Sequence, residues 1–224
     1  MATPVDSVSL GYKIASLGWD VYKTFRNSAQ LRTGRAGYRF TSSLTTLEFS
    51  YSGEQQQANY VQDRTILFLR DEVRLPPFLY RTDGEDKIDQ LLVNESARPF
   101  KIVPEGGGGK FIEADEHIHY SKKDVVRAVL FASSTNGYPN RVEYFDLRIV
   151  DYIDKLTFFV IFPPEKMIKK VILYYQLRED SSTTWKPATR EKYEVRHTTQ
   201  RRRAFVWEAI APKHGNKFRV EWEW

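Results

Sequence analysis

From Gly37 to the end of the chain, apolar and polar residues alternate with a period of two over many short segments. Successive side chains of a β-strand point to opposite faces of a sheet, so the pattern predicts strands with one buried face. The predicted strands are Tyr38–Thr41, Thr45–Tyr51, Arg64–Leu69, Phe78–Arg81, Phe100–Val103, Lys110–Ala114, His117–Tyr120, Val125–Phe131, Val142–Ile149, Leu156–Phe162, Lys170–Leu177, Tyr193–His197, Phe205–Ile210 and Phe218–Trp224. So many strands without helices between them predict a mainly β fold of antiparallel, immunoglobulin-like β-sandwich type.

The alternation is clearest in the last two predicted strands. Phe205–Ile210 and Phe218–Trp224 each place aromatic and aliphatic residues on one face, with charged residues opposite in the second segment. Pro212 and Gly215 lie between them, as is typical of a turn. The pattern predicts an antiparallel hairpin that completes the β-region, with Trp222 in the core.

Before Gly37 the period changes to that of a helix. Apolar residues recur at steps of three and four over residues 7–30, which predicts one amphipathic α-helix. The residues proposed for its contact surface are Leu10, Ile14, Leu17, Trp19 and Tyr22. The apolar sector is wide, so two interpretations stay open. The helix packs on its own domain, or it serves assembly by docking on another chain or on a membrane surface.

These elements suggest three regions: a helix over residues 1–35, a first β-region over 36–122 and a second β-sandwich region over 123–224. Phe40-Thr-Ser-Ser43 is echoed by Phe131-Ala-Ser-Ser134, which allows an internal duplication without establishing one. Two hundred and twenty-four residues suffice for one large domain or for two that each bury a core. The sequence therefore predicts one or two β-sandwich domains after the helix.

Composition narrows the function classes. The chain has no cysteine, which excludes disulfides, a thiolate nucleophile and cysteine-ligated zinc. The sequence shows neither a secretory signal nor an apolar run long enough to span a bilayer, so we expect a cytoplasmic protein. The formal net charge is +5, but acidic residues are nearly as numerous as basic ones. This balance makes nucleic-acid binding an unfavoured alternative.

One segment has the residue types of a metal site. His117 and His119 would share a face of the predicted strand, and Glu113 could join them as a third ligand. The alternative is a pair of histidines on an exposed strand face. The sequence contains no nucleophile motif, and we expect neither catalysis nor a bound cofactor.

Aromatic residues of the second half suggest a binding surface. Tyr174 and Trp185 lie in or beside a predicted strand that is apolar on both faces, and Arg201, Arg202 and Arg203 follow in the sequence. Rings beside cationic side chains favour an anionic or stacking ligand, such as a nucleotide. The alternative is a central strand whose rings are buried on both sides.

The C-terminal pattern Trp207-x-Ala209-x-Ala211-Pro212 followed by Gly215-x-x-Phe218-x-Val220-x-Trp222 resembles the closing hairpins of β-sandwich modules appended to bacterial signalling and defence proteins. The resemblance implies an accessory or ligand-sensing module and transfers no site residues. The leading hypothesis is a non-catalytic binding or adaptor protein that recognises a partner protein or an anionic small ligand and forms an oligomer. The alternatives are a metal-dependent enzyme centred on His117 and His119, and a weak nucleotide or nucleic-acid binder.

Overall fold

The computed structural model describes residues 37–82, 85–104, 109–115, 117–177, 184–198 and 202–224. These residues form strands and turns without any helix, and so none that could span a membrane. The strands are β1 (Tyr38–Ser52), β2 (Gln55–Phe68), β3 (Phe78–Arg81), β4 (Glu85–Val93), β5 (Ser96–Arg98), β6 (Phe100–Pro104), β7 (Gly109–Ala114), β8 (Val125–Thr135), β9 (Val142–Arg148), β10 (Lys155–Ile161), β11 (Lys170–Gln176), β12 (Lys186–Pro187), β13 (Tyr193–His197), β14 (Arg203–Ile210) and β15 (Lys217–Glu223).

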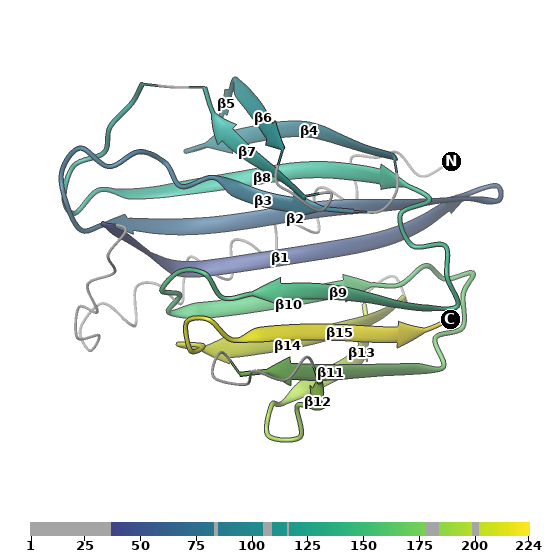
Figure 1. Cartoon of the computed structure of the whole chain (residues 1–224). Coiled ribbons are helices and arrows are strands. Elements are labelled where there is room, and N and C mark those ends of the chain that lie inside the picture. The colour runs from purple at the N-terminus through teal and green to yellow at the C-terminus, as the bar shows by residue number, and fades with distance from the viewer. Residues whose placement is uncertain (1–36, 83–84, 105–108, 116, 178–183, 199–201) are drawn as a thin grey trace.

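The strands form one large sheet and two small ones (Figure 1). The large sheet has eight strands in the order β13-β14-β10-β1-β2-β8-β4-β5. A four-stranded sheet, β12-β11-β15-β9, and a three-stranded sheet, β3-β7-β6, both lie on the same side of it. All neighbouring strands are antiparallel except β1 and β10, which run parallel.

A β-bulge keeps the apolar residues of the long strand β1 on the side of the sheet that faces the small sheets. The register of β1 against β2 shifts between Phe40 and Ser42. The extra residue moves the inward positions from even to odd numbers, so Phe40 and Leu47 point to the same side. Both side chains are almost fully buried. One strand therefore contributes to the packing beneath both small sheets.

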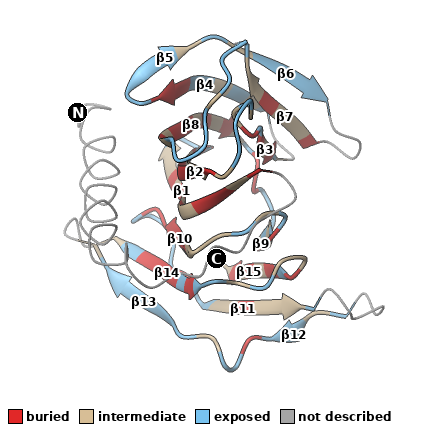
Figure 2. Ribbon diagram, turned by 90° about the vertical axis from the view of Figure 1, so that its left-hand side faces the viewer, coloured by how far each residue is buried: buried red, intermediate tan, exposed pale blue. Residues whose placement is uncertain are grey.

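Two hydrophobic cores fill the space between the layers (Figure 2). The first lies under the four-stranded sheet and includes Phe158, Trp207 and Trp222. The second lies under the three-stranded sheet and includes Ile66 and Phe78. The large sheet is continuous across both cores, so it is the scaffold that fixes the positions of the small sheets.

The prediction of a helix followed by immunoglobulin-like sandwiches was wrong for the described residues, which contain no helix and build one large sheet covered by two small ones. The predicted helix over residues 7–30, with Leu10, Ile14, Leu17, Trp19 and Tyr22, lies outside the described residues. The division near residue 122 stays a prediction. Backbone pairing crosses it, because β8 lies between β2 and β4, and β10 lies beside β1.

The predicted C-terminal hairpin is also wrong in its pairing. β14 belongs to the eight-stranded sheet and β15 to the four-stranded sheet, so the two strands face each other across the first core. The rings of Trp207 and Phe218 meet across the gap in a tilted arrangement, with centroids 4.5 Å apart. Ala211 and Gly215 have positive φ angles in the connection, which turns the chain from one sheet to the other. Trp222 is 1% exposed, so its predicted burial is confirmed.

Candidate binding surface

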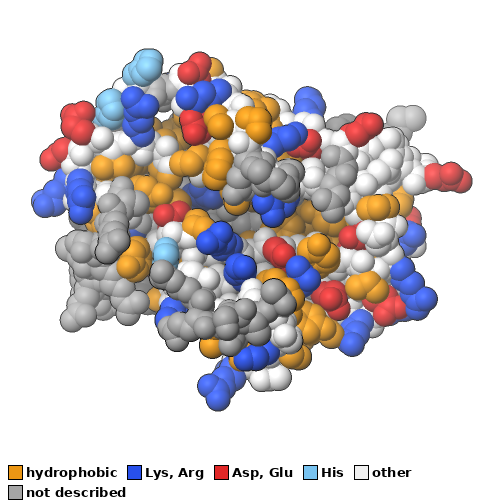
Figure 3. All heavy atoms as spheres, in the orientation of Figure 1, with side chains coloured by type: hydrophobic (Ala, Val, Ile, Leu, Met, Phe, Trp, Pro, Cys, Tyr) orange, Lys and Arg blue, Asp and Glu red, His pale blue; other side chains and the backbone are white. Residues whose placement is uncertain are grey.

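The outer face of the four-stranded sheet points away from the large sheet and carries a concentrated set of rings and cations. Strand register sets this group, because every second residue of β9, β15 and β11 points outward. We call it the basic–aromatic face and define it by Tyr144, Arg148, Tyr174, Trp185, Lys217 and Arg219. Figure 3 views the side of the molecule on which this sheet lies, where basic, acidic and hydrophobic side chains are interspersed over the lower half.

Arg219 lies at the centre of the basic–aromatic face. Its guanidinium carbon is 3.8 Å from the ring centroid of Tyr144 and 4.5 Å from that of Trp185. Its Nε and Nη2 atoms donate to the two carboxylate oxygens of Asp146 at 2.7 and 2.8 Å. These hydrogen bonds to Asp146 raise the pKa of the guanidinium and keep it charged. The ion pair and the two rings therefore hold Arg219 in one orientation.

Tyr174 extends the same face across β11. Its hydroxyl group donates to Glu221 Oε1 at 3.4 Å, and it lies directly opposite Arg219 in the strand register. Partial burial, followed by the neighbouring carboxylate of Glu221, raises the pKa of Tyr174. The phenol therefore stays neutral at physiological pH and can donate a hydrogen bond.

Two cations of the basic–aromatic face have no charged partner among the described residues. Arg148 and Lys217 lie directly opposite each other on β9 and β15, and both are exposed. Neither forms an ion pair within the described part of the chain. The acidic side chains of this face do have partners, because Asp146 binds Arg219, Glu221 accepts from Tyr174 and Glu223 pairs with Arg141. Like charges placed directly opposite destabilise a sheet, so a bound anion would relieve the repulsion.

The two described arginines of the predicted basic run, Arg202 and Arg203, make their contacts away from this face. Arg201 lies outside the described residues. Arg202 forms a partly buried ion pair with Glu48 and donates to the backbone carbonyls of Phe162 and Phe49. Arg203 donates to the carbonyl of Ile168 at 2.9 Å. Tyr174 and Trp185 of the predicted surface do lie on the basic–aromatic face, where the cations are Arg148, Lys217 and Arg219.

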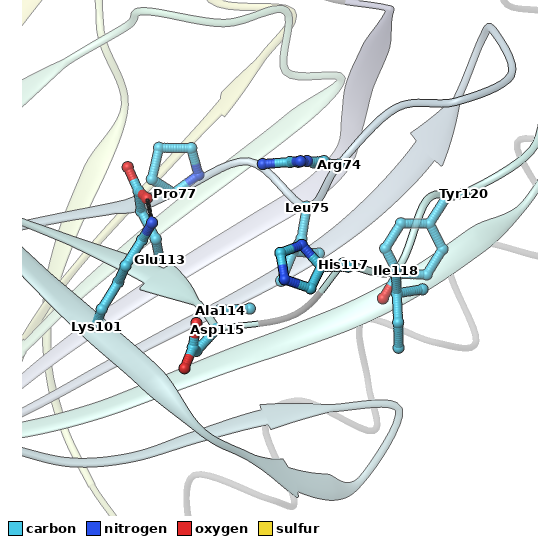
Figure 4. A pocket seen from close by; sticks show the side chains of 10 residues that line it. All are labelled: Arg74, Leu75, Pro77, Lys101, Glu113, Ala114, Asp115, His117, Ile118 and Tyr120. Atoms are coloured by element: carbon cyan, nitrogen blue, oxygen red, sulfur yellow. Dashed lines mark ion pairs between the residues drawn. The ribbon is translucent and has the colours of Figure 1, made fainter.

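A separate cavity of about 280 Å³ lies beside the three-stranded sheet (Figure 4). Its lining includes Leu75, Pro77, Ala114, Asp115, Ile118 and Tyr120, together with Arg74, Lys101, Glu113 and His117. Lys101 and Glu113 form an ion pair at 3.1 Å on one side of the cavity. Arg74 Nε donates to Nε2 of the neighbouring His119 at 3.4 Å. These charged groups therefore satisfy one another without a ligand.

The predicted metal ligands lie near this cavity but contact other side chains. His117 and His119 follow β7 in a loop, so the alternation of a strand does not place them on one face. Besides its contact with Arg74, His119 lies 3.7 Å from a carboxylate oxygen of Glu72. Across the described ranges, no three His, Asp or Glu side chains are grouped as metal ligands would be. The metal-site hypothesis gains no support from this arrangement.

Sequence reasoning selected Tyr174 and Trp185 as site residues but did not select Tyr144, Arg148, Lys217 or Arg219. Each of these four residues stands on the polar side of an alternating strand, where it is indistinguishable from any solvent-exposed residue. Only the register of β9 against β15 brings them together. The alternation of charges with aromatic residues in Val142–Arg148 was the one signal available in the sequence.

No protein-family model and no curated protein matches the sequence. Solved structures do match the fold. A structure assigned as a protease from Parabacteroides distasonis has a TM-score of 0.51 at 8% identity, over 85% of this chain and 41% of that one. An M1 zinc metallopeptidase from Deinococcus radiodurans has a TM-score of 0.47 at 10% identity, over 84% of this chain and 43% of that one. The chain thus spans less than half the length of these proteins, and the likeness concerns the fold alone.

Proposed function

We propose that this chain is a non-catalytic binding module whose basic–aromatic face recognises an acidic segment of a partner protein. The observation that carries the proposal is the opposed pair Arg148 and Lys217, two exposed cations that have no anionic partner within the described residues. Their charges are available to a bound carboxylate without breaking an existing ion pair.

The rings beside these cations support a protein partner. Tyr, Trp and Arg are the residue types most enriched among those that contribute strongly to protein interfaces. Arg219 is already fixed between Tyr144 and Trp185 by its pairing with Asp146. Side chains that are ordered before binding lose less conformational entropy when a partner arrives. The face therefore combines unpaired positive charge with preordered rings.

An acidic peptide fits this face better than nucleic acid does. Asp146, Glu221 and Glu223 lie among the cations on the same strands. A continuous phosphate backbone would meet these carboxylates, whereas a peptide can place its acidic side chains opposite Arg148 and Lys217 alone. We infer that the partner presents a few carboxylates beside an aromatic or aliphatic residue.

A titration of the full chain with a labelled peptide tests the proposal. The probe is Asp-Glu-Asp-Tyr-Glu-Asp-Glu with an N-terminal fluorophore, and its neutral counterpart replaces each acid by its amide. We expect saturable binding of the acidic peptide and a weakening of about tenfold in the Arg148→Ala/Lys217→Ala variant, as two partly screened charge pairs are lost. The matched control is Lys87→Ala/Lys122→Ala, which removes two exposed lysines outside the face and should leave the affinity unchanged.

Two further probes separate the other sources of anionic charge. Citrate represents a small anionic ligand, and a ten-nucleotide oligothymidine represents nucleic acid. Equal affinity for the acidic and neutral peptides, or the same affinity in the Arg148→Ala/Lys217→Ala variant, would contradict the proposal. Binding of the oligothymidine with a steep salt dependence and in preference to the acidic peptide would replace it with the nucleic-acid alternative.

A further inference from the structure

The edge strand β13 ends one side of the eight-stranded sheet. It pairs with β14 on one side, and no other described strand pairs with it. All five of its residues, Tyr193 to His197, are exposed. An open edge presents a row of backbone donors and acceptors to which another strand can add.

Two hydrogen bonds establish which backbone groups of β13 point outward. The amide of Phe162 donates to the carbonyl of Arg203 at 2.9 Å, so Arg203 and every second residue of β14 turn toward β10. The amide of Thr198 donates to the carbonyl of Arg202 at 2.7 Å, so the other residues of β14 turn toward β13. Antiparallel pairs alternate between bonded and non-bonded positions. The backbone groups of Val195, midway along β13, therefore point away from the sheet.

The two residues that flank Val195 carry opposite charges. Glu194 and Arg196 flank it and share the face of the sheet opposite to Val195. Glu194 has no ion pair among the described residues. Arg196 lies with its guanidinium carbon 5.6 Å from the ring centroid of Phe159 and has no carboxylate partner in the same ranges. Both charges are available to a partner at the open edge.

We propose that two copies of this chain pair antiparallel through β13, about a two-fold axis at Val195, so that their eight-stranded sheets become one continuous sheet. Because the Val195 backbone points outward, the two Val195 residues would form a hydrogen-bonded pair. Each Glu194 then lies opposite Arg196 of the second copy, at a non-bonded position where side chains approach most closely. One strand thus supplies both halves of two equivalent ion pairs.

Charged residues at a sheet edge often serve to prevent such pairing. That role requires charges which repel an incoming copy of the same strand. Here the two charges have opposite signs and stand two residues apart, so antiparallel pairing at Val195 brings attraction instead of repulsion. Val195 itself is 51% exposed, and the pairing would cover part of this apolar side chain. The strand is chemically self-complementary, as a two-fold interface requires.

Analytical ultracentrifugation of the full chain between about 1 and 200 μM tests the pairing, because a five-residue strand pair forms a small and weak interface. We expect a concentration-dependent dimer. Glu194→Arg places four positive charges around the axis and should weaken the dimer by about tenfold or more. Glu194→Arg/Arg196→Glu restores opposite charges and should return the dimer to within about threefold of wild type.

Two variants separate this interface from general effects of charge and folding. Glu54→Arg changes the charge of an exposed turn by the same amount and should leave the dimer intact. Val195→Pro removes an outward N–H without removing a bond to β14, so the monomer should keep its circular dichroism spectrum and lose the dimer. A monomer at all concentrations, a dimer that survives Glu194→Arg, or a failure of the charge exchange to restore it would each overturn the proposal. The peptide-binding face is untouched by these variants, so the two proposals fail independently.

Discussion

Two basic sites of this protein contain similar side chains and differ in what surrounds them. Arg202 lies just before β14 with its side chain 13% exposed, and Glu48 and two backbone carbonyls accept its hydrogen bonds. Arg148 and Lys217 are exposed on the four-stranded sheet and have no charged partner among the described residues. The basic run around Arg202 is conspicuous in the sequence, whereas Arg148 and Lys217 stand 69 positions apart. Clustering along the chain therefore does not distinguish a structural cation from one available for binding.

The largest expected effect comes from removing the largely buried charge. Arg202→Met leaves Glu48, whose side chain is 14% exposed, without its partner, which should lower the free energy of unfolding by about 3–5 kcal/mol. Urea denaturation followed by circular dichroism measures the change. The matched control Arg148→Met should change stability by less than about 0.5 kcal/mol. Equal effects of the two substitutions would abolish the distinction between the sites.

Two tryptophans allow the same comparison between a structural side chain and one available for binding. Trp222 is buried in the first core, whereas Trp185 lies partly exposed on the basic–aromatic face. Trp222→Ala should cost about 3–5 kcal/mol of stability, as truncation of a buried ring does. Trp185→Ala should cost less than about 1 kcal/mol and weaken binding of the acidic peptide. A loss below about 1 kcal/mol for Trp222→Ala, measured by thermal and urea denaturation, would show that its ring does not support the core.

A buried tyrosine should make the stability of the protein depend on pH in the alkaline range. Burial raises the pKa of Tyr60 to about 12, whereas an unfolded tyrosine titrates near pH 10. The stability that the neutral Tyr60 side chain contributes is fully present below about pH 10. It is lost as the pH rises from about 10 to 12, at up to about 1.4 kcal/mol per pH unit. Tyr60→Phe should flatten this part of the stability curve. Between pH 7 and 9 the wild-type and variant curves should run parallel, and an unchanged slope above pH 10 would contradict the assignment.

The smallest expected effect concerns the ion pair that orders Arg219. Asp146→Asn removes a partly exposed pair and should cost about 0.5–1 kcal/mol of stability. Because Arg219 would lose its fixed position between Tyr144 and Trp185, we expect weaker peptide binding despite the additional positive charge. Fluorescence titration with the acidic peptide measures the effect. Tighter binding would mean that the net positive charge of the face contributes more to peptide affinity than the fixed orientation of Arg219.

Alternation predicted the strands in which apolar and polar residues alternate most regularly, such as β15. It missed β4, whose first six residues are mostly charged or polar, and it missed β5 and β12, which are too short to show a period. Strand order and register depend on contacts between distant segments and leave no local signal. For this reason Tyr174 could be selected from the sequence, whereas its neighbour Arg219 could not.

The parallel pairing of β1 with β10 has a consequence for folding kinetics. Ser43 lies beside Leu156, 113 positions away, whereas β1 and β2 are joined by a two-residue turn. Local antiparallel pairs form early, and closing a long loop is slow because the chain entropy must be lost before the contact is made. We expect a folding intermediate in which β1 is paired with β2 but not yet with β10. Its exposed edge would make this intermediate the species most prone to aggregation during refolding.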